Sequence, residues 1–208
     1  MTLFGATYSV YVRIVRLVLE ETGIPYELAE VDIFNPDKVP SDYEERHPFC
    51  RIPAIEHDGF RLFETDAIVA YLLDRFGDHG LLPDDIRARA RMRQSMRIAD
   101  NYAYRALVWG IYVEEMERGR LGRLTPDELA STAKCLRVLD DLSTPDFLAG
   151  ARLTLADLWL QPMLAYLALA PAGRGLLRGA PKLSAWLARM QQRRAVIATR
   201  FPAEQGDA

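Results

Sequence analysis

Cysteine is scarce in this chain of 208 residues, which contains only Cys50 and Cys135. The two form no Cys-x-x-Cys pair and no cluster with histidine. The sequence therefore predicts neither a disulfide framework nor a structural zinc site, and we expect no bound metal. So few cysteines fit a reducing compartment, and we expect a cytoplasmic protein.

Long hydrophobic runs are also missing. No apolar stretch approaches the roughly 18 residues that a membrane-spanning helix needs. Residues 1–13 lack the basic start and long apolar stretch that are typical of a signal peptide. We therefore expect a soluble protein with no membrane partner.

An excess of positive charge is absent too, because the formal net charge is −3 at pH 7. This balance argues against general nucleic-acid binding. The charge is uneven, since residues 1–80 carry 7 Lys and Arg against 15 Asp and Glu, and the remainder carries 19 against 14. The asymmetry predicts two halves of different character that face each other, the second able to attract a small anion. Scattered solvated arginines are an equally good explanation.

The first 77 residues give strand and helix signals in the order β-α-β and then β-β-α. Apolar residues at i, i+3 and i+4 mark the helices, and Asp58-Gly59 is a strong hairpin signal. The first unit requires parallel strands with a right-handed crossover, whereas a hairpin is antiparallel. A mixed sheet of this kind with helices on its faces is the thioredoxin-like arrangement. The expected strands are Thr2–Phe4, Tyr26–Ile33, Ile52–Glu56 and Arg61–Glu64, and the expected helices are centred on Tyr11–Leu19 and Ala67–Leu72.

Strand signals end at residues 78–85, DHGLLPDD, which are typical of a linker. Residues 86–208 are expected to form an all-helical bundle domain. Its helices are predicted at about 86–118, 125–142, 154–170 and 181–195, with proline and glycine breaking the chain between them. The sequence thus predicts an α/β domain over 1–77 followed by an all-α domain.

Pro53 stands at the start of an expected strand, where it cannot donate a ladder hydrogen bond. If the Ile52–Pro53 bond is cis, the backbone N–H and C=O of Ile52 turn outward and can pair with an extended peptide ligand. A trans proline on an edge strand is the alternative.

The segment Glu64-Thr65-Asp66 follows a strand and opens a helix. The unpaired N–H groups of a helix N-terminus, its dipole and the Thr65 hydroxyl together make a carboxylate site. An acidic neighbour can pair with an ammonium group, so the segment can recognise an amino-acid head group. Ordinary helix capping explains the same residues.

Three segments, taken together, resemble the soluble glutathione transferase family. HPFCRIPAI at 47–55 is similar to the family's third-strand pattern, and Glu64-Thr65-Asp66-Ala67-Ile68 is similar to its glutathione-binding pattern. FLAGARLTLADL at 147–158 resembles its helical-domain box, in which Thr154 and Asp157 form a helix-capping device. The order and spacing match over nearly the whole chain, which is identified as a serine-type, theta- or phi-like, bacterial member.

The resemblance implies that the N-terminal domain binds glutathione as a co-substrate and lowers the pKa of its thiol. The thiolate would then attack a hydrophobic electrophile. Serine-type classes use a hydroxyl after the first strand, which assigns the catalytic role to Ser9. Ser9 is also a reasonable helix N-cap, and Thr7, Tyr8 and Tyr11 are nearby alternatives. No cysteine stands at this position, which disfavours dithiol redox chemistry.

The resemblance also implies further site residues and a homodimer. The cysteinyl part of glutathione would lie on Ile52 and Pro53, and the γ-glutamyl head group on Glu64 and Thr65. Arg51 would contact the glycyl carboxylate, and Asp100 would reach the γ-glutamyl amine across the dimer. The electrophile would lie between the domains, although aromatic residues at helical spacing more often form core. The candidate lining residues are Tyr8, Tyr102, Tyr104, Trp109 and Tyr112.

Three positions depart from the family pattern. His47 replaces an asparagine, Cys50 replaces a glycine, and Thr65 replaces the commoner serine while keeping the hydroxyl. Cys50 puts the shape of its loop in question, because it places a β-carbon where glycine relaxes the backbone. Glutathione-dependent peroxide reduction or isomerisation at the same site is a second interpretation. A non-catalytic member that binds glutathione or a protein is a third.

Overall fold

The structure, a computed structural model, describes residues 1–205 and divides the chain into two compact units. Unit 1 comprises residues 1–79 together with the segment from residue 194 onward, and unit 2 comprises residues 80–193. The sequence-based division placed all of 86–208 in the helical domain, whereas the segment from residue 194 packs with the sheet-bearing unit. Its contacts with the first helix, described below, account for this difference.

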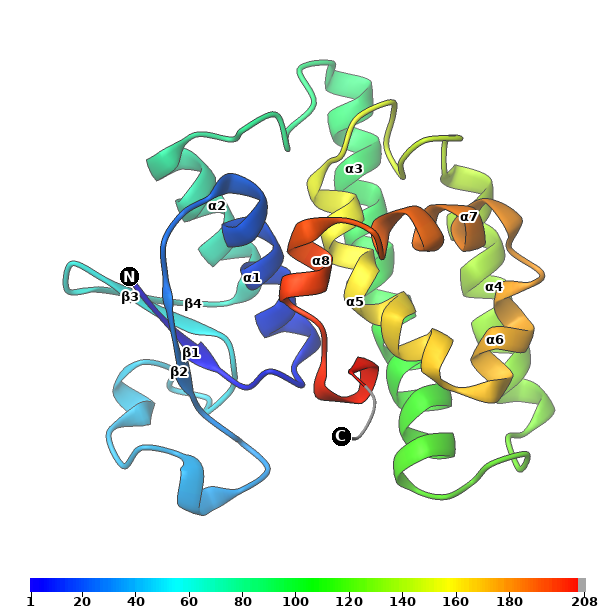
Figure 1. Cartoon of the computed structure of the whole chain (residues 1–208), viewed down its shortest axis with the longest axis horizontal. Helices are drawn as coiled ribbons and strands as arrows, with labels where there is room; N and C mark the ends of the chain where they lie inside the picture. The colour runs from blue at the N-terminus through cyan, green and yellow to red at the C-terminus, as the bar shows by residue number, and fades with distance from the viewer. Residues whose placement is uncertain (206–208) are drawn as a thin grey trace. The chain divides into compact units, whose positions relative to one another are not determined.

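Unit 1 is built on a four-stranded mixed sheet (Figure 1). The strands are β1 (Thr2–Gly5), β2 (Glu27–Glu30), β3 (Ala54–His57) and β4 (Phe60–Phe63), and their order in the sheet is β2-β1-β3-β4. β1 runs parallel to β2 and antiparallel to β3, which pairs antiparallel with β4. This arrangement confirms the predicted thioredoxin-like βαβ-ββα fold.

Local chemistry explains the turns of unit 1. Asp58 and Gly59 adopt φ angles of 51° and 81°, the left-handed values that a two-residue hairpin requires. β2 is shorter than expected, and two short 3₁₀ helices, Pro36–Lys38 and Tyr43–Glu45, occupy the irregular stretch that follows it.

Two helices of unit 1 begin at the positions that matter for the site. They are α1 (Val10–Thr22) and α2 (Thr65–Phe76), which pack against each other, and α8 (Arg194–Ala198) packs on α1. α1 ends at Gly23, which takes a left-handed φ of 69° and donates its N–H to a carbonyl of the last turn. A final 3₁₀ turn, Pro202–Glu204, follows α8.

Unit 2 is entirely helical, as predicted. Its elements are α3 (Ile86–Ile98), a π-helix that continues it (Ala99–Glu117), α4 (Pro126–Leu142), α5 (Leu155–Leu169), α6 (Pro171–Leu177) and α7 (Pro181–Met190). α5 is buried along most of its length and packs against the π-helix. Thr125 with Glu128, and Thr154 with Asp157, form the capping boxes of α4 and α5. None of the helices within residues 1–205 combines the length and hydropathy that crossing a bilayer requires.

Candidate active site

The sheet register brings the functional segments of unit 1 to one edge. Phe4 near the end of β1 pairs with Ala54 at the start of β3, and Ala54 pairs with Phe63 at the end of β4. The chain therefore leaves β1, enters β3 and leaves β4 at the same edge. The predicted residues on these three segments are Ser9, Arg51, Ile52, Pro53, Glu64 and Thr65.

Ser9 is the N-cap of α1, with extended backbone angles. Its Oγ accepts a hydrogen bond from the N–H of Val12 at 3.3 Å, and no residue within 1–205 accepts the proton of its hydroxyl. A free hydroxyl proton at a helix N-terminus is suited to an anion, because the helix dipole favours negative charge there. Ser9 thus caps the helix and keeps a proton available for a ligand.

The hydroxyl of the neighbouring residue, Tyr8, already donates a hydrogen bond within the protein. Its phenol donates to Asp32 Oδ1 at 2.8 Å, and the same oxygen accepts from the N–H of Phe34 at 3.1 Å. Burial, and then this hydrogen bond, raise the pKa of Tyr8 well above its ordinary value, so the phenol stays neutral. The exposed ring of Phe34 lies over Tyr8 with 5.6 Å between ring centres.

Asp32 and Phe34 were not predicted as site residues, although the sequence contains a signal for them. Both follow β2, and β2 is parallel to β1, with Gly5 paired to Glu30. Residues that follow two neighbouring parallel strands emerge at the same edge of a sheet. The structure accordingly places Asp32 within hydrogen-bonding distance of Tyr8.

The Ile52–Pro53 bond is cis, the first of the two alternatives left by the sequence. The backbone of Ile52 makes no hydrogen bond with any other residue in the described chain. The Arg51 guanidinium is exposed and forms no hydrogen bond or ion pair with residues 1–205, while its carbonyl accepts from Tyr43 at 2.8 Å. A backbone donor and acceptor and one cation are thus available to a ligand on this segment.

Glu64 and Thr65 form an open helix N-terminus. Glu64 is the N-cap of α2 but supplies no side-chain cap, and it adopts a left-handed φ of 71°, a sparsely populated conformation for a residue other than glycine. The backbone N–H groups of Thr65 and Ala67 find no acceptor among residues 1–205. Backbone strain of this kind clusters at functional sites, and unpaired donors at a helix N-terminus favour an anion such as a carboxylate.

Two of the departures from the family pattern have visible structural consequences. His47 is buried against the ring of Phe63, 4.6 Å between centres, and its Nδ1 has no partner in the described part of the chain. Burial lowers the pKa of His47 below its usual value. Cys50 adopts a left-handed φ of 47°, the region that favours glycine, with its Sγ 3.8 Å from Glu44 Oε1.

Asp100 lies in unit 2, in the first turn of the π-helix. Its carboxylate accepts from Trp159 Nε1 at 2.8 Å and pairs with Arg97 at 3.0 Å. Any contact from Asp100 to a ligand of a partner subunit would have to compete with both groups.

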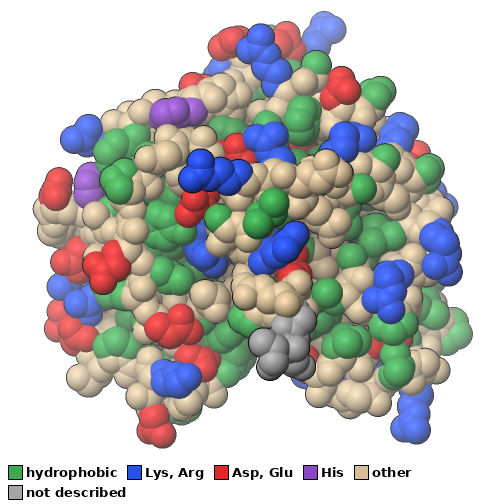
Figure 2. All heavy atoms as spheres, viewed as in Figure 1, with side chains coloured by type: hydrophobic (Ala, Val, Ile, Leu, Met, Phe, Trp, Pro, Cys, Tyr) green, Lys and Arg blue, Asp and Glu red, His purple; other side chains and the backbone are tan. Residues whose placement is uncertain are grey.

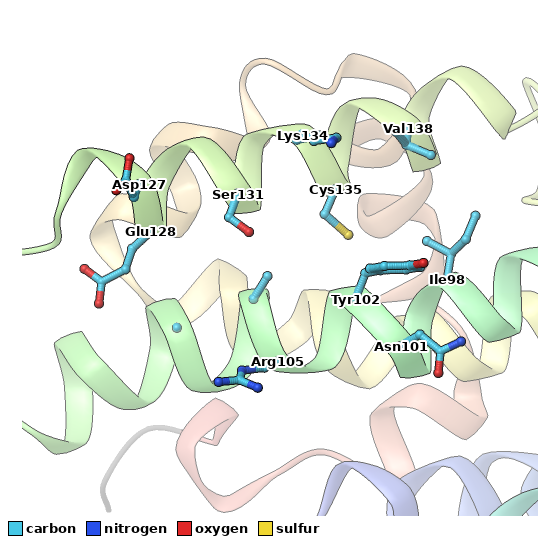
Figure 3. Close-up of a pocket in the computed structure, with 12 residues that line it drawn as sticks. Ile98, Asn101, Tyr102, Arg105, Asp127, Glu128, Ser131, Lys134, Cys135 and Val138 are labelled. Carbon is cyan, nitrogen blue, oxygen red and sulfur yellow. The ribbon is translucent and has the colours of Figure 1, made fainter.

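The predicted aromatic residues of unit 2 do not line one common pocket. Tyr102 lines a groove of about 860 Å³ between the π-helix and α4, and its ring lies between these helices beside Cys135 (Figure 3). Tyr104 and Trp109 meet edge to face at 6.5 Å, away from the lining of this groove. Tyr112 is buried against Tyr166, 4.3 Å between ring centres, so it serves the helical core.

Charge is distributed as the sequence indicates. On the face seen in Figure 2, acidic side chains gather on the sheet-bearing unit, and Lys and Arg predominate on the helical unit. No group of three or more His, Cys, Asp or Glu side chains within residues 1–205 is placed to hold a metal ion.

Comparison with known proteins agrees with this geometry. Residues 3–80 match the family model for the glutathione S-transferase N-terminal domain, and residues 115–189 match the model for its C-terminal domain. The chain is 30% identical to glutathione S-transferase F12 of Arabidopsis thaliana, over 79% of this chain and 80% of that protein. It is 29% identical to mouse (Mus musculus) glutathione S-transferase theta-1, over 86% and 77%.

Among solved structures, glutathione transferase F7 of Populus trichocarpa superimposes with a TM-score of 0.81 at 26% identity. The match covers 100% of this chain and 99% of the poplar chain, so both units share the fold of that enzyme. Ser9 and Thr65 stand at the N-termini of α1 and α2, at one end of the shared sheet. The family model, the F12 relative and the poplar structure show that the chain is an enzyme of the glutathione S-transferase family.

Proposed function

We propose that this enzyme conjugates the thiolate of glutathione to a hydrophobic electrophile, with Ser9 as the hydroxyl that stabilises the sulfur anion. The proposal rests on the Ser9 hydroxyl at the N-terminus of α1, because no residue within 1–205 accepts its proton. A free thiol has a pKa of about 8.5, so only a small fraction is the nucleophilic thiolate at neutral pH. A hydroxyl donor and a helix dipole both favour the charged form, which raises that fraction.

The remaining parts of glutathione have matching groups on the same sheet edge. The unpaired backbone of Ile52 would pair with the cysteinyl residue, next to Pro53. The open N-terminus of α2, with Thr65 and the carboxylate of Glu64, would hold the γ-glutamyl head group. The unpaired guanidinium of Arg51 would contact the glycyl carboxylate, since a cation at the edge of the site favours an anionic terminus.

The test separates chemistry from binding with two variants. Ser9→Ala should lower kcat by about 100-fold or more and change the calorimetric Kd for glutathione by less than about threefold, because the hydroxyl acts on the thiolate. Thr65→Val should weaken glutathione binding by about tenfold, because it removes a hydroxyl from a buried polar site. Unchanged turnover in Ser9→Ala would contradict the assignment, and unchanged affinity in Thr65→Val would remove Thr65 from the site.

We also propose that the enzyme is cytoplasmic and assembles as a homodimer. The free thiols of Cys50 and Cys135 support a reducing compartment.

Screening peroxides and isomerisable substrates beside aryl halides would show which glutathione-dependent reaction dominates. Glutathione binding without any turnover would instead support a non-catalytic member of the family.

A further inference from the structure

The side chain of Arg13, at the end of the first turn of α1, is fully buried. A buried arginine requires partners, because its charge loses the hydration that water provides. The guanidinium pairs with the carboxylate of Glu204, and its Nη2 donates to the carbonyl of Val196 at 3.3 Å. Its Cζ also lies 4.2 Å from the centre of the Phe201 ring. All three partners come from the last part of the chain, which belongs to unit 1.

This last part, residues 196–204, is fastened to α1 at successive turns, and we call it the C-terminal clamp. Glu204 Oε2 accepts both from Arg13 and from the N–H of Phe201, the latter at 2.8 Å. One turn further along α1, Arg16 donates to the carbonyl of Ala198 at 3.2 Å. Phe201 is itself fully buried, so the clamp combines a charged contact with apolar packing.

The backbone of the same turn holds Ser9. The N–H of Arg13 donates to the Ser9 carbonyl at 2.9 Å, and the N–H of Val12 donates to Ser9 Oγ at 3.3 Å. Both hydrogen bonds depend on where this turn of α1 lies. A movement of Arg13 relative to the sheet would therefore move the Ser9 hydroxyl with it.

We propose that Arg13 is a positioning residue, through which the C-terminal clamp fixes the first turn of α1 and the direction of the Ser9 hydroxyl. The proposal rests on the proposed role of Ser9. Arg13 contacts no substrate and acts only through Ser9. Small displacements matter, because misplacing a reacting group by about 1 Å can reduce the rate about 100-fold.

The first experiment compares Glu204→Gln with Glu20→Gln in the full-length protein. Both remove one negative charge from unit 1, but Glu20 is exposed on α1 and makes no contact with Arg13. With glutathione and 1-chloro-2,4-dinitrobenzene as substrates, Glu204→Gln should lower kcat about tenfold and keep the KM for glutathione within about twofold. The apparent pKa of the bound thiol, from the pH profile of the rate, should rise. Glu20→Gln should match the wild type, and a folded Glu204→Gln with wild-type kcat would overturn the proposal.

A second variant separates positioning from mere stability, and it also serves if Glu204→Gln does not fold. Replacing both members of a buried ion pair with apolar residues often preserves stability, so Arg13→Met/Glu204→Met should fold. If the pair only supports the fold, this double variant regains full kcat, which would overturn the proposal. If the pair positions Ser9, kcat stays about tenfold low although thermal unfolding is normal.

Amide hydrogen exchange at positions 12 and 13 gives a readout that does not depend on activity. These two amides report directly on the hydrogen bonds to Ser9, and the double variant should exchange them about tenfold faster than the wild type. A wild type without turnover would refute the proposed function alone. Unchanged exchange in the double variant would refute the clamp, whether or not the wild type is active.

Discussion

At the scale of single residues, the site depends on where each hydroxyl proton points. Tyr8 and Ser9 are adjacent and both carry a hydroxyl near the sheet edge. Tyr8 directs its proton to Asp32, whereas the Ser9 proton has no acceptor within residues 1–205. The hydrogen bonds, and not proximity in sequence, distinguish the two candidates.

This difference predicts that Tyr8→Phe retains most of its activity. Removing the phenolic oxygen breaks the bond to Asp32 but takes no donor from the sulfur, so kcat should fall less than about threefold. The lost hydrogen bond should lower the free energy of unfolding by about 1 kcal/mol. Steady-state kinetics beside Ser9→Ala, with urea unfolding, would check both values. A loss of kcat as large as that of Ser9→Ala would show that Tyr8 is the catalytic hydroxyl.

The burial of His47 predicts that the free energy of unfolding depends on pH. Burial lowers the pKa of His47 in the folded protein, so the unfolded chain binds its proton first as the pH falls. The stability tied to neutral His47 is therefore complete above the unfolded pKa of about 6.5 and is lost as the pH falls toward the folded value. The free energy of unfolding should fall more steeply from pH 7 to 5 in the wild type than in His47→Asn.

The exposed histidine His79 provides the matched control for this measurement. His79→Gln should keep the wild-type slope of unfolding free energy against pH. Equal slopes in His47→Asn and the wild type would show that the buried ring carries no proton-linked stability.

At the scale of elements, α6 was not predicted because its proline and glycine residues are typical of segments that interrupt helices. Pro171, Gly173 and Gly175 are poor helix formers by propensity. Pro171 nevertheless occupies a first-turn position, where its missing N–H costs nothing, and Glu115 from the π-helix accepts the N–H of Ala172 at 3.0 Å. The helix is thus fixed by tertiary contacts that local propensity does not contain.

Substituting alanine for each of the two glycines of α6 should change the free energy of unfolding in opposite directions. A β-carbon at Gly173 would lie 1.9 Å from the carbonyl oxygen of Leu167, so Gly173→Ala should cost about 2 kcal/mol or more of unfolding free energy. A β-carbon at Gly175 would meet nothing nearer than the end of the Arg178 side chain at 3.6 Å. Gly175→Ala should be neutral or stabilise by up to about 1 kcal/mol, because alanine favours the helix. Urea denaturation of both variants would test this, and similar effects would contradict the close approach at Gly173.

The sequence sufficed for elements whose signals are local. The hairpin turn at Asp58-Gly59 and the capping box of Thr154 with Asp157 each follow from a few neighbouring residues. The role of Asp32 was not predicted, because it follows from the end of β2 lying beside the end of β1 and not from the neighbours of Asp32 in the sequence. The clamp on Arg13 was not predicted either, because Glu204 lies 191 residues away along the chain.

At the scale of the whole molecule, the proposed assembly makes a testable prediction. The proposed homodimer predicts a mass near twice the 23.6 kDa of one chain in size-exclusion chromatography with light scattering. If Asp100 contributes across the dimer, Asp100→Asn should weaken glutathione binding without dissociating the dimer. A monomer would contradict the assembly and remove that role from Asp100.

Because residues 1–79 and the segment from residue 194 onward form one unit, that unit is discontinuous in the chain, and the whole of unit 2 is synthesised between its two parts. A chain emerging from the ribosome can complete the helical unit first, although domains usually fold in order from the N-terminus. Until residues 201–204 have left the ribosome, Arg13 has neither Glu204 nor Phe201 as a partner. The sheet-bearing unit, first to be made, is therefore the last to be finished.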